Sequence, residues 1–202
     1  MVKKAQTAPQ GQIRIIAGLW RGRKLPVLTH DGLRPTTDRV RETLFNWLMP
    51  VINGARCLDA FAGSGALGFE ALSRYAAAVT FTELNRTVAA QISANARLLK
   101  CEQATVVNQS ALQFLAQPGT PFDVVFLDPP FRKGLLQETV DLLEQNNWLS
   151  PEAMIYIEAE AESDTLVVPG NWVCHREKVA GQVAYRLYLR QTQTTEQESV
   201  CS

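Results

Sequence analysis

The chain has 202 residues, of which 46% are hydrophobic and 20% are charged. This length suits one domain with a sizeable core, and the hydrophobic fraction excludes a wholly disordered chain. No run of about 18 apolar residues occurs, so the sequence predicts no transmembrane helix. The formal net charge is zero, but nine basic and two acidic residues lie between Met1 and Arg41. Because the N-terminal end is basic, a net charge of zero does not exclude a nucleic-acid partner.

The four cysteines are widely spaced and form no C-x-x-C pair: Cys57, Cys101, Cys174 and Cys201. With only two histidines besides, the chain offers little from which to build a zinc site, and we expect no metal. The first ten residues lack the apolar segment of a secretory signal. We therefore expect reduced thiols and a cytoplasmic protein without a membrane partner.

The N-terminal part is predicted to form a hairpin and a helix. Two β-like runs, Ile13–Ala17 and Lys24–Leu28, flank a segment with two glycines and predict the hairpin. Asp38–Met49 has apolar residues at helical spacing, with Thr37 or Asp38 as the N-cap. The predicted organisation is a disordered tail over 1–11, an extension over 12–52, a main domain over 53–190 and a second disordered tail over 191–202.

The main domain alternates short apolar runs with helical patterns. This alternation predicts right-handed βαβ crossovers and an α/β fold whose mostly parallel seven-stranded sheet has helices on both faces. The last two strands flank Ala180 and Gly181, so they should form an antiparallel hairpin at the C-terminal edge. The predicted strands are Cys57–Phe61, Ala78–Glu83, Thr105–Asn108, Phe122–Leu127, Ala153–Glu158, Trp172–Val179 and Gln182–Leu189. The predicted helices are Ala66–Tyr75, Arg86–Leu99, a short one after Ser110, and Leu135–Glu144.

A glycine-rich segment stands where the first of these strands turns into a helix. Gly63, Gly65 and Gly68 fit the pattern G-x-G-x-x-G, and the next strand ends at Glu83. Glycines allow a tight turn and a close approach of a ligand, and a carboxylate at the second strand end can accept both hydroxyls of a ribose. The combination indicates a nucleoside-containing cofactor, and a turn without a ligand is the alternative.

Asp59 precedes this loop and helps to distinguish among nucleoside cofactors. Its carboxylate would repel a pyrophosphate but attract the ammonium group of a methionine-like moiety. This favours S-adenosylmethionine over a dinucleotide. The alternative is that Asp59 only caps the loop by accepting hydrogen bonds from backbone N–H groups.

The sequence Asp128-Pro129-Pro130-Phe131 follows the apolar strand Phe122–Leu127 directly, which places it at the carboxyl edge of the sheet beside the glycine loop. The Asp128 carboxylate and the Pro129 carbonyl can accept both hydrogens of one exocyclic amino group, and Phe131 can lie flat against a base. Two acceptors would orient the amino nitrogen for attack on a sulfonium methyl group. Asp128 could also take the surplus proton, or water could. A proline-rich turn is the alternative.

These motifs resemble those of class I S-adenosylmethionine-dependent amino-methyltransferases: D-A-F-A-G-S-G at 59–65, Glu83, and D-P-P-F at 128–131. Two N-terminal segments, R-I-I-A-G-L-W-R-G-R-K-L and R-P-T-T-D-R-V-R-E-T-L-F-N-W-L, closely resemble the bacterial 16S rRNA (guanine-N2)-methyltransferase family of type D, over roughly residues 12–190. The resemblance implies a Rossmann-like fold and S-adenosylmethionine as the cofactor. It also implies methylation of N2 of one guanine in 16S rRNA, within the 30S subunit or a late assembly intermediate.

Motifs and resemblance together assign candidate site residues. The resemblance places Ser110 and Ala111 near the adenine, with Asn108 or Gln109 as the accompanying amide. The predicted cofactor-binding residues are Asp59, Phe61, Gly63, Gly65, Glu83, Leu84, Ser110, Ala111 and Asp128. The predicted catalytic residues are Asp128, Pro129, Pro130 and Phe131.

The basic end has a composition suited to structured RNA, because cations attract phosphates and Trp stacks on unpaired bases. The predicted RNA-binding residues are Arg14, Trp20, Arg21, Arg23, Lys24, Arg34 and Arg39. The alternative is a solvated basic face with Trp20 in the core. The acidic residues after the fifth strand of the main domain are expected to form a solvated loop: Glu158, Glu160, Glu162 and Asp164.

Three other functions stay open at this point. A DNA adenine-N6 methyltransferase would use D-P-P-F equally well, although no separate target-recognition domain is evident. A nicotinamide dehydrogenase fits the glycines but leaves D-P-P-F without a role. A non-catalytic RNA-binding assembly factor would not need Asp128. We expect a monomer, because the sequence contains no coiled-coil seam.

Overall fold

Strands and helices alternate along the chain in a computed structural model that describes residues 11–28, 37–130, 133–161 and 166–192. Within these residues the strands are β1 (Gly11–Arg14), β2 (Lys24–Val27), β3 (Arg56–Asp59), β4 (Ala78–Thr82), β5 (Ala104–Val107), β6 (Phe122–Leu127), β7 (Leu149–Glu160), β8 (Trp172–Ala180) and β9 (Val183–Arg190). The helices are α1 (Asp38–Leu48), α2 (Ala66–Ser73), α3 (Arg86–Leu99), α4 (Ala111–Leu115) and α5 (Leu135–Gln145).

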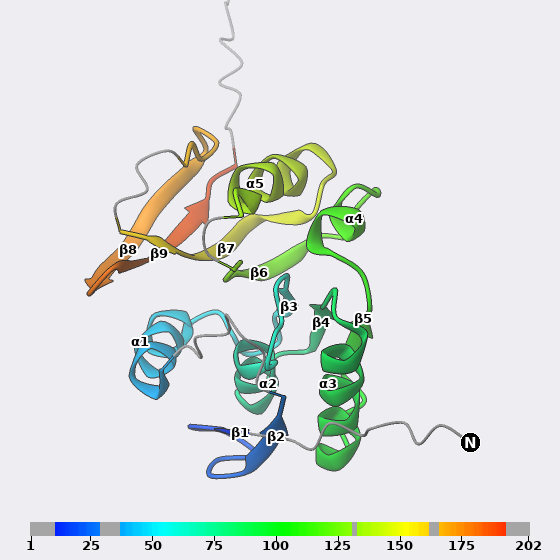
Figure 1. The fold of residues 1–202 in the computed structure, drawn as a ribbon. Coiled ribbons are helices and arrows are strands. Elements are labelled where there is room, and N and C mark those ends of the chain that lie inside the picture. The colour runs from blue at the N-terminus through cyan, green and yellow to red at the C-terminus, as the bar shows by residue number, and fades with distance from the viewer. Residues whose placement is uncertain (1–10, 29–36, 131–132, 162–165, 193–202) are drawn as a thin grey trace, which may run out of the picture.

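The sheet at the centre of the molecule has the strand order β5-β4-β3-β6-β7-β9-β8 (Figure 1). Neighbouring strands from β5 to β7 run parallel, whereas β9 runs antiparallel to β7 and to β8. The predicted α/β fold with an antiparallel edge hairpin is therefore confirmed. The strand order reverses between β3 and β6, and folds of this kind bind ligands at the carboxyl ends of the strands beside that reversal.

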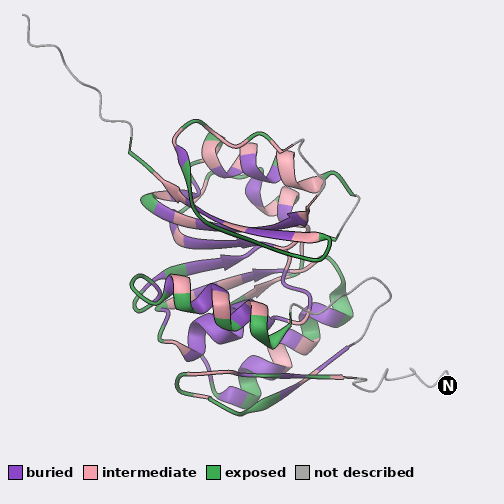
Figure 2. Ribbon diagram, turned by 90° about the vertical axis from the view of Figure 1, so that its left-hand side faces the viewer, coloured by how far each residue is buried: buried purple, intermediate pink, exposed green. Residues whose placement is uncertain are grey.

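Helices cover both faces of this sheet. On one face α1, α2 and α3 pack against β4 and β6 through a core that contains Phe45, Phe69 and Phe81. On the other face α4 and α5 bury Leu115 and Leu143 against β6 and β7. Figure 2 shows buried residues along the strands and on the inner sides of the helices. Because helices bury both faces of the sheet, the sequences of the central strands are continuous apolar runs rather than alternating ones.

The predicted N-terminal hairpin is confirmed, with β1 antiparallel to β2 and Ile13 opposite Leu25. β1 covers Gly11–Arg14 rather than the predicted Ile13–Ala17, so it begins at a residue that the sequence places in the tail and ends three residues earlier than predicted. The hairpin lies against α2 and α3 (Figure 1), and Ile13, Ile15 and Leu25 belong to the same core as these helices. The extension therefore shares a core with the sheet.

The structure decides one boundary that the sequence left open and corrects another. Of the two predicted N-cap residues of α1, the structure has Thr37, whose hydroxyl accepts a hydrogen bond from the Val40 N–H (3.4 Å). The predicted solvated loop is wrong for Glu158 and Glu160, which both lie in β7. β7 extends further than its apolar pattern because it pairs with β9 as far as Glu160. The other two acidic residues of that prediction, Glu162 and Asp164, lie outside the described residues.

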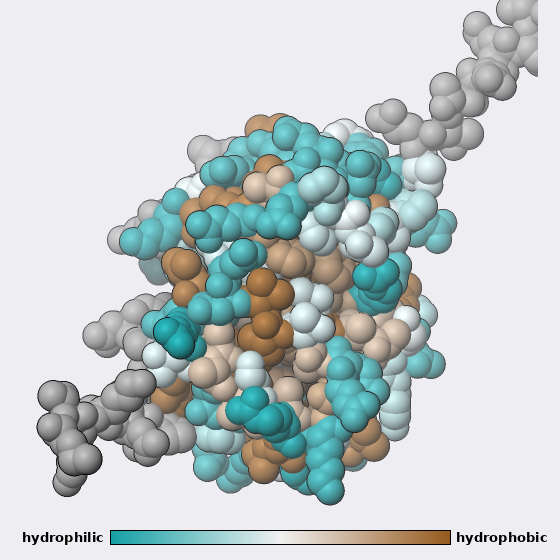
Figure 3. All heavy atoms as spheres, turned by 90° about the vertical axis from the view of Figure 1, so that its right-hand side faces the viewer, coloured by the Kyte–Doolittle hydropathy of each residue, from teal (hydrophilic) through white to brown (hydrophobic). Residues whose placement is uncertain are grey.

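β5 forms one edge of the sheet. Figure 3 views the molecule from the side of α3, β5 and α4, and it shows apolar surface bordered by hydrophilic residues. Val106 and Val107 on β5 are partly exposed, and Leu98 on α3 is exposed. None of the described helices combines the length and apolar character needed to cross a membrane.

Candidate active site

The loop between β3 and α2 is held by hydrogen bonds to both neighbouring strands. The Ala60 N–H donates to the carbonyl of Phe126 on β6 (3.1 Å), and the Ala62 N–H donates to the carbonyl of Thr82 on β4 (3.1 Å). The Thr82 hydroxyl in turn donates to the Ala60 carbonyl (2.6 Å). The loop is thus fixed to the two strands on either side of β3, and a ligand would meet a preformed backbone.

Two glycines of the loop motif have distinct structural roles. Gly65 is the N-cap of α2 and has a φ of +76°, a left-handed conformation that favours glycine. Gly68 lies in the first turn of α2, where a Cβ would stand 2.1 Å from the ring of Phe81 on β4. A larger residue at position 68 would therefore force the helix away from the sheet. These two requirements explain Gly65 and Gly68 without a ligand, so the ligand has to be inferred from the neighbouring groups.

Glu83 lies just past β4 and turns its side chain toward the glycine loop. One carboxylate oxygen accepts a hydrogen bond from the Gly63 N–H (3.0 Å), and the other accepts from the Asn85 N–H (2.7 Å). The side chain is half-buried, and a carboxylate has about four acceptor positions. Glu83, which the sequence predicts to bind the ribose, therefore lies beside the loop, and its carboxylate can accept further hydrogen bonds.

Asp59 is only 3% exposed and lies beneath the loop. Its carboxylate accepts a hydrogen bond from the Gly68 N–H (3.0 Å). Burial raises the pKa of Asp59 to about 7, and the negative charge of Glu83 adds to the effect, although the Gly68 N–H opposes it. This placement favours the alternative in which Asp59 holds the first turn of α2. Its contact with a methionine ammonium stays a prediction.

The ends of β4 and β5 form the region predicted to receive the adenine. Leu84 is 70% exposed there. The amide nitrogen of Asn108 donates to the carbonyls of Glu83 (2.8 Å) and Leu84 (3.0 Å), which ties the two strand ends together. The predicted amide thus has a structural role in addition to any contact with the base.

Ser110 and Ala111 lie close to these strand ends, at the beginning of α4. Ser110 is the N-cap of this helix, and its hydroxyl accepts a hydrogen bond from the Gln113 N–H (3.2 Å). Ala111 is buried. Phe61, within the glycine loop, is half-buried and packs against the core between the sheet, α4 and α5. The structure places these residues at the carboxyl edge, and their cofactor contacts stay predictions.

The segment that follows β6 lies beside the glycine loop. Phe126, whose carbonyl holds the loop at Ala60, is two residues before Asp128. Asp128 is half-buried, Pro129 is buried and Pro130 is exposed. Phe131 lies outside the described residues. The structure therefore brings Asp128 and the glycine loop to the same edge of two adjacent strands, as predicted.

Two polar side chains on β7 also reach this edge, and the sequence interpretation missed them. The Tyr156 hydroxyl donates to the Glu158 carboxylate (2.7 Å), and both side chains are buried. Burial raises the pKa of Tyr156, with further contributions from the charges of Glu158 and Asp128. The phenol therefore lies near both carboxylates. The signal in the sequence was a tyrosine and a glutamate two positions apart within an apolar run.

The basic residues predicted to bind RNA do not share one environment. Arg14 forms an exposed ion pair with Asp38 (3.4 Å). Trp20 is half-buried and packs against the core, which favours the alternative that the sequence left open for it. The exposed cations among the predicted set are Arg14, Arg21, Arg23, Lys24 and Arg39. Arg34 lies outside the described residues. Three of these exposed cations, Arg21, Arg23 and Lys24, therefore lie on or directly after the turn of the hairpin.

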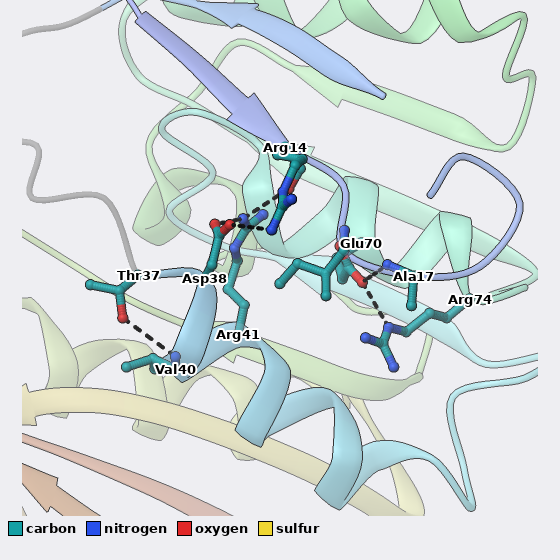
Figure 4. Close-up of polar contacts among 9 residues, drawn as sticks. Arg14, Ala17, Thr37, Asp38, Val40, Arg41, Glu70 and Arg74 are labelled. Carbon is teal, nitrogen blue, oxygen red and sulfur yellow. Dashed lines mark hydrogen bonds and ion pairs between the residues drawn. The ribbon is translucent and has the colours of Figure 1, made fainter. Parts of the chain in front are cut away.

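Buried polar side chains on α2 anchor the hairpin, and no motif indicated them. The carboxylate of Glu70 accepts hydrogen bonds from the backbone N–H groups of Ile16 (2.8 Å) and Ala17 (3.0 Å). It also accepts from the Arg74 guanidinium (2.8 Å). Figure 4 shows Glu70 between Ala17 and Arg74. The Ser73 hydroxyl donates to the Ala17 carbonyl (2.6 Å). The orientation of the hairpin is therefore determined by α2.

Arg41 belongs to the basic N-terminal part but is buried rather than available to a partner. Its guanidinium donates to the Arg14 carbonyl (2.9 Å) and to the Asp38 carboxylate (2.5 Å), as Figure 4 shows. These contacts join α1 to β1. The positive charge of the first 41 residues is therefore partly structural.

Comparison with known proteins assigns the family. The family model described as "Conserved hypothetical protein 95" matches residues 13–189. A protein from Escherichia coli strain K12 named Ribosomal RNA small subunit methyltransferase D is 64% identical over 95% of this chain and 97% of its own length. A protein of the same name from Haemophilus influenzae is 60% identical over 93% of this chain and 99% of its own length. The chain belongs to this family.

Solved structures of similar chains agree with that assignment. The Escherichia coli protein yhhF, described as a methyltransferase, is 66% identical with a TM-score of 0.84, and the match covers 91% of this chain and 100% of that one. A structure described as a methylase from Haemophilus influenzae is 57% identical with a TM-score of 0.79, over 90% of this chain and 99% of that one. The Rossmann-like methyltransferase fold implied by the resemblance is therefore confirmed.

Proposed function

We propose that this chain transfers a methyl group from S-adenosylmethionine to the exocyclic N2 amino group of one guanine in 16S rRNA. The observation that carries the proposal is the position of Asp128 and Pro129 beside the glycine loop, which Ala60 ties to the strand preceding them. Relatives named as small-subunit rRNA methyltransferases support the broader part, the methylation of ribosomal RNA. The guanine and its N2 atom rest on the amino-group chemistry and on the resemblance of the motifs.

The residues at the carboxyl edge fit S-adenosylmethionine. The backbone of Gly63 and Gly65 permits close approach, and Glu83 has acceptor capacity for the ribose hydroxyls beyond its two backbone hydrogen bonds. Exposed Leu84 offers an apolar surface for the adenine. When bound, the cofactor supplies a methyl group on a positively charged sulfur, which is electrophilic without further activation.

The chain's own residues have to prepare the amino nitrogen. Its lone pair is delocalised into the base, so acceptors at Asp128 and Pro129 would hold both hydrogens and favour a pyramidal nitrogen aimed at the methyl group. The Asp128 carboxylate would also stabilise the positive charge that develops on nitrogen and could receive the proton afterwards. This reaction needs no covalent nucleophile. Burial raises the pKa values of the Cys57 and Cys101 thiols, which disfavours the nucleophilic thiolate form of both.

The exposed cations on the hairpin turn would hold RNA that flanks the target base, because the turn packs against Ser73 at the C-terminal end of α2, whereas the glycine loop lies at the N-terminal end of that helix. Arg21, Arg23 and Lys24 are exposed, and contacts to α2 fix the hairpin that carries them. Phosphate contacts made in this way position a substrate without reading its bases. We propose the 30S subunit or a late assembly intermediate as the substrate, in the cytoplasm, with the protein acting as a monomer and without a metal. Among the described residues no group of three or more potential ligands is arranged for a metal ion.

The test is incubation of the protein with methyl-labelled S-adenosylmethionine and, separately, 30S particles, naked 16S rRNA or duplex DNA. The labelled nucleic acid is then digested and its nucleosides are separated. We expect label in N2-methylguanosine from the ribosomal substrates. Label in N6-methyladenine from DNA would contradict the proposal and favour the DNA methyltransferase alternative.

A further inference from the structure

Asp128 has a second carboxylate beside it. β6 and β7 are parallel neighbours with Leu127 opposite Ile157, so the next position along each strand brings Asp128 alongside Glu158. Side chains at paired positions of neighbouring strands point to the same face of a sheet. Phe126 and Tyr156, one pair earlier on that face, both belong to the core beneath α1. Glu158 therefore flanks Asp128 on the face covered by α1.

Glu158 is held in place rather than extended into solvent. It is 7% exposed, and its carboxylate accepts the hydrogen bond of the Tyr156 hydroxyl (2.7 Å). On its other side Glu158 is opposite Tyr185 of β9. A carboxylate has about four acceptor positions on its two oxygens. A buried carboxylate fixed in this way at the reacting edge matches a ligand that donates a hydrogen bond and disfavours one that presents a lone pair.

The base of the proposed reaction has such a donor next to the reacting amino group. In guanine the N2 amino group is flanked by the protonated N1, which donates, whereas the N1 of adenine or of 2-aminopurine is an unprotonated acceptor. The carbon that bears this amino group is bonded to N1 on one side and to N3 on the other, so a base held at Asp128 and Pro129 with N1 on the side of β7 would bring its N1–H to Glu158. A carboxylate there would attract the N1–H of guanine and repel the N1 lone pair of the other purines.

We propose that Glu158 is a specificity-determining residue that accepts the N1–H of the target guanine, and that Tyr156 is a positioning residue that orients the Glu158 carboxylate. This inference rests on the proposed function, because it assumes an amino group at the purine C2 position. It explains how a D-P-P-F motif that suits any exocyclic amino group could be restricted to guanine. It also assigns a role to the polar pair on β7.

The experiment compares guanine with 2-aminopurine at the target position. 2-Aminopurine keeps the amino group on C2 but has an unprotonated N1. The analogue is placed by ligation into 16S rRNA at the guanine that the wild-type protein methylates, and the RNA is reconstituted into 30S particles. kcat/KM is measured on both substrates for the wild type, Glu158→Gln, Tyr156→Phe and the control Glu160→Gln. Glu160 is on the same strand and face, two residues further along.

The wild type is expected to prefer guanine by about 100-fold or more, and Glu158→Gln to lower that preference by about ten- to hundred-fold, because the amide can donate to an unprotonated N1. Tyr156→Phe should lower it by about two- to five-fold, and Glu160→Gln should leave it unchanged. A purely structural role would reduce both activities equally and keep their ratio, which would overturn the inference.

The remaining outcomes also decide the question. A wild-type enzyme that methylates 2-aminopurine as fast as guanine overturns the role of Glu158 while leaving the proposed function intact. No transfer to guanine in any ribosomal substrate overturns the proposed function and this inference together. If Glu158→Gln does not fold, the ratio of kcat/KM on guanine to kcat/KM on 2-aminopurine, measured for the wild type and for Tyr156→Phe, decides whether the inference holds.

Discussion

The carboxyl edge of the sheet and the N-terminal hairpin are held in place in different ways. At the edge, the glycine loop is fixed by backbone hydrogen bonds from Ala60 and Ala62 to the adjacent strands and by the side chains of Thr82 and Glu83 at the end of β4. The hairpin is fixed by side chains from α2, chiefly the buried Glu70, more than 50 residues away in the sequence. A site made from strand ends leaves a short motif in the sequence, whereas a docked segment depends on distant single residues. Variants at the edge should therefore change the chemistry, whereas variants at α2 should change the docking of the hairpin.

The largest expected effect is on the chemistry. Asp128→Ala should lower kcat for methyl transfer by about 1,000-fold or more, because the amino group loses its charged acceptor. The fold should persist, since Asp128 lies at the end of a strand and is only half-buried. Single-turnover kinetics on 30S particles measures the effect. The matched control is Asp123→Asn, at the other end of β6, where the carboxylate accepts the Arg56 N–H. Near-normal turnover of Asp128→Ala would exclude this mechanism.

The second effect is on the docking of the hairpin. Glu70→Gln should lower the free energy of unfolding by about 2–4 kcal/mol, because a buried carboxylate with three donors is replaced by a neutral amide beside Arg74. Urea denaturation measures this, and Glu42→Gln on the exposed side of α1 is the control. Hydrogen exchange should increase at Ile16 and Ala17. Unchanged exchange there would show that Glu70 does not anchor the hairpin.

The third effect concerns the cofactor. Glu83→Ala should weaken S-adenosylmethionine binding about ten- to hundred-fold, because the ribose acceptor is removed and the Gly63 N–H loses its partner. Isothermal titration calorimetry gives the dissociation constant. Glu102→Ala, which removes an exposed carboxylate just before β5, should leave it unchanged. Equal affinities for the wild type and Glu83→Ala would remove Glu83 from the cofactor site.

A pH dependence of stability is expected from Asp59. Its pKa in the folded protein is about 7, above its ordinary value of 3.8, mainly because of burial. The folded state therefore binds more protons than the unfolded state between these values, so this stabilisation is complete below about pH 4 and lost as the pH rises through 7. Asp59→Asn should remove a decline on the order of 2–3 kcal/mol between pH 5 and pH 8. Parallel urea curves at the two pH values check this, and an identical decline in the variant would contradict it.

The smallest effect is electrostatic. Reversing Arg21 and Arg23 to glutamate should weaken binding to 16S rRNA and reduce the slope of log K against log salt, by about 0.7 for each phosphate that the protein no longer neutralises. Filter binding between about 50 and 200 mM salt measures the slope. The control reverses Arg97 and Lys100, which are exposed on and just after α3. The same change in slope for both pairs would mean that the hairpin turn has no special part in RNA binding.

The features of the fold and the site that depend on interactions between residues close in the sequence could be predicted, whereas those that depend on distant residues could not. The spacing of apolar residues and the turn residues between elements predicted the parallel sheet, the bounds of α3 and β6, and the edge hairpin. The glycine loop, Glu83 and Asp128 were predictable as a group because parallel strand ends meet at one edge.

Other features depend on contacts that no local pattern contains. The burial of Glu158 follows from the pairing of β7 with β9, and that of Arg41 from contacts to β1. The position of Trp20 against the core and the anchoring by Glu70 depend on how the hairpin lies on α2. The zero net charge likewise conceals basic side chains in different environments, because Arg21 and Arg23 are exposed on the hairpin turn whereas Arg41 is buried in the fold.

Methylation of guanine by this chain is tested most directly in cells that lack it. 16S rRNA is isolated from such a strain, and from the same strain supplied with the wild-type protein or with Asp128→Ala, and its modified nucleosides are quantified by mass spectrometry. We predict that one N2-methylguanosine is missing in the deletion strain, returns with the wild type and stays missing with the variant. An N2-methylguanosine content that is the same in all three would contradict the proposed function.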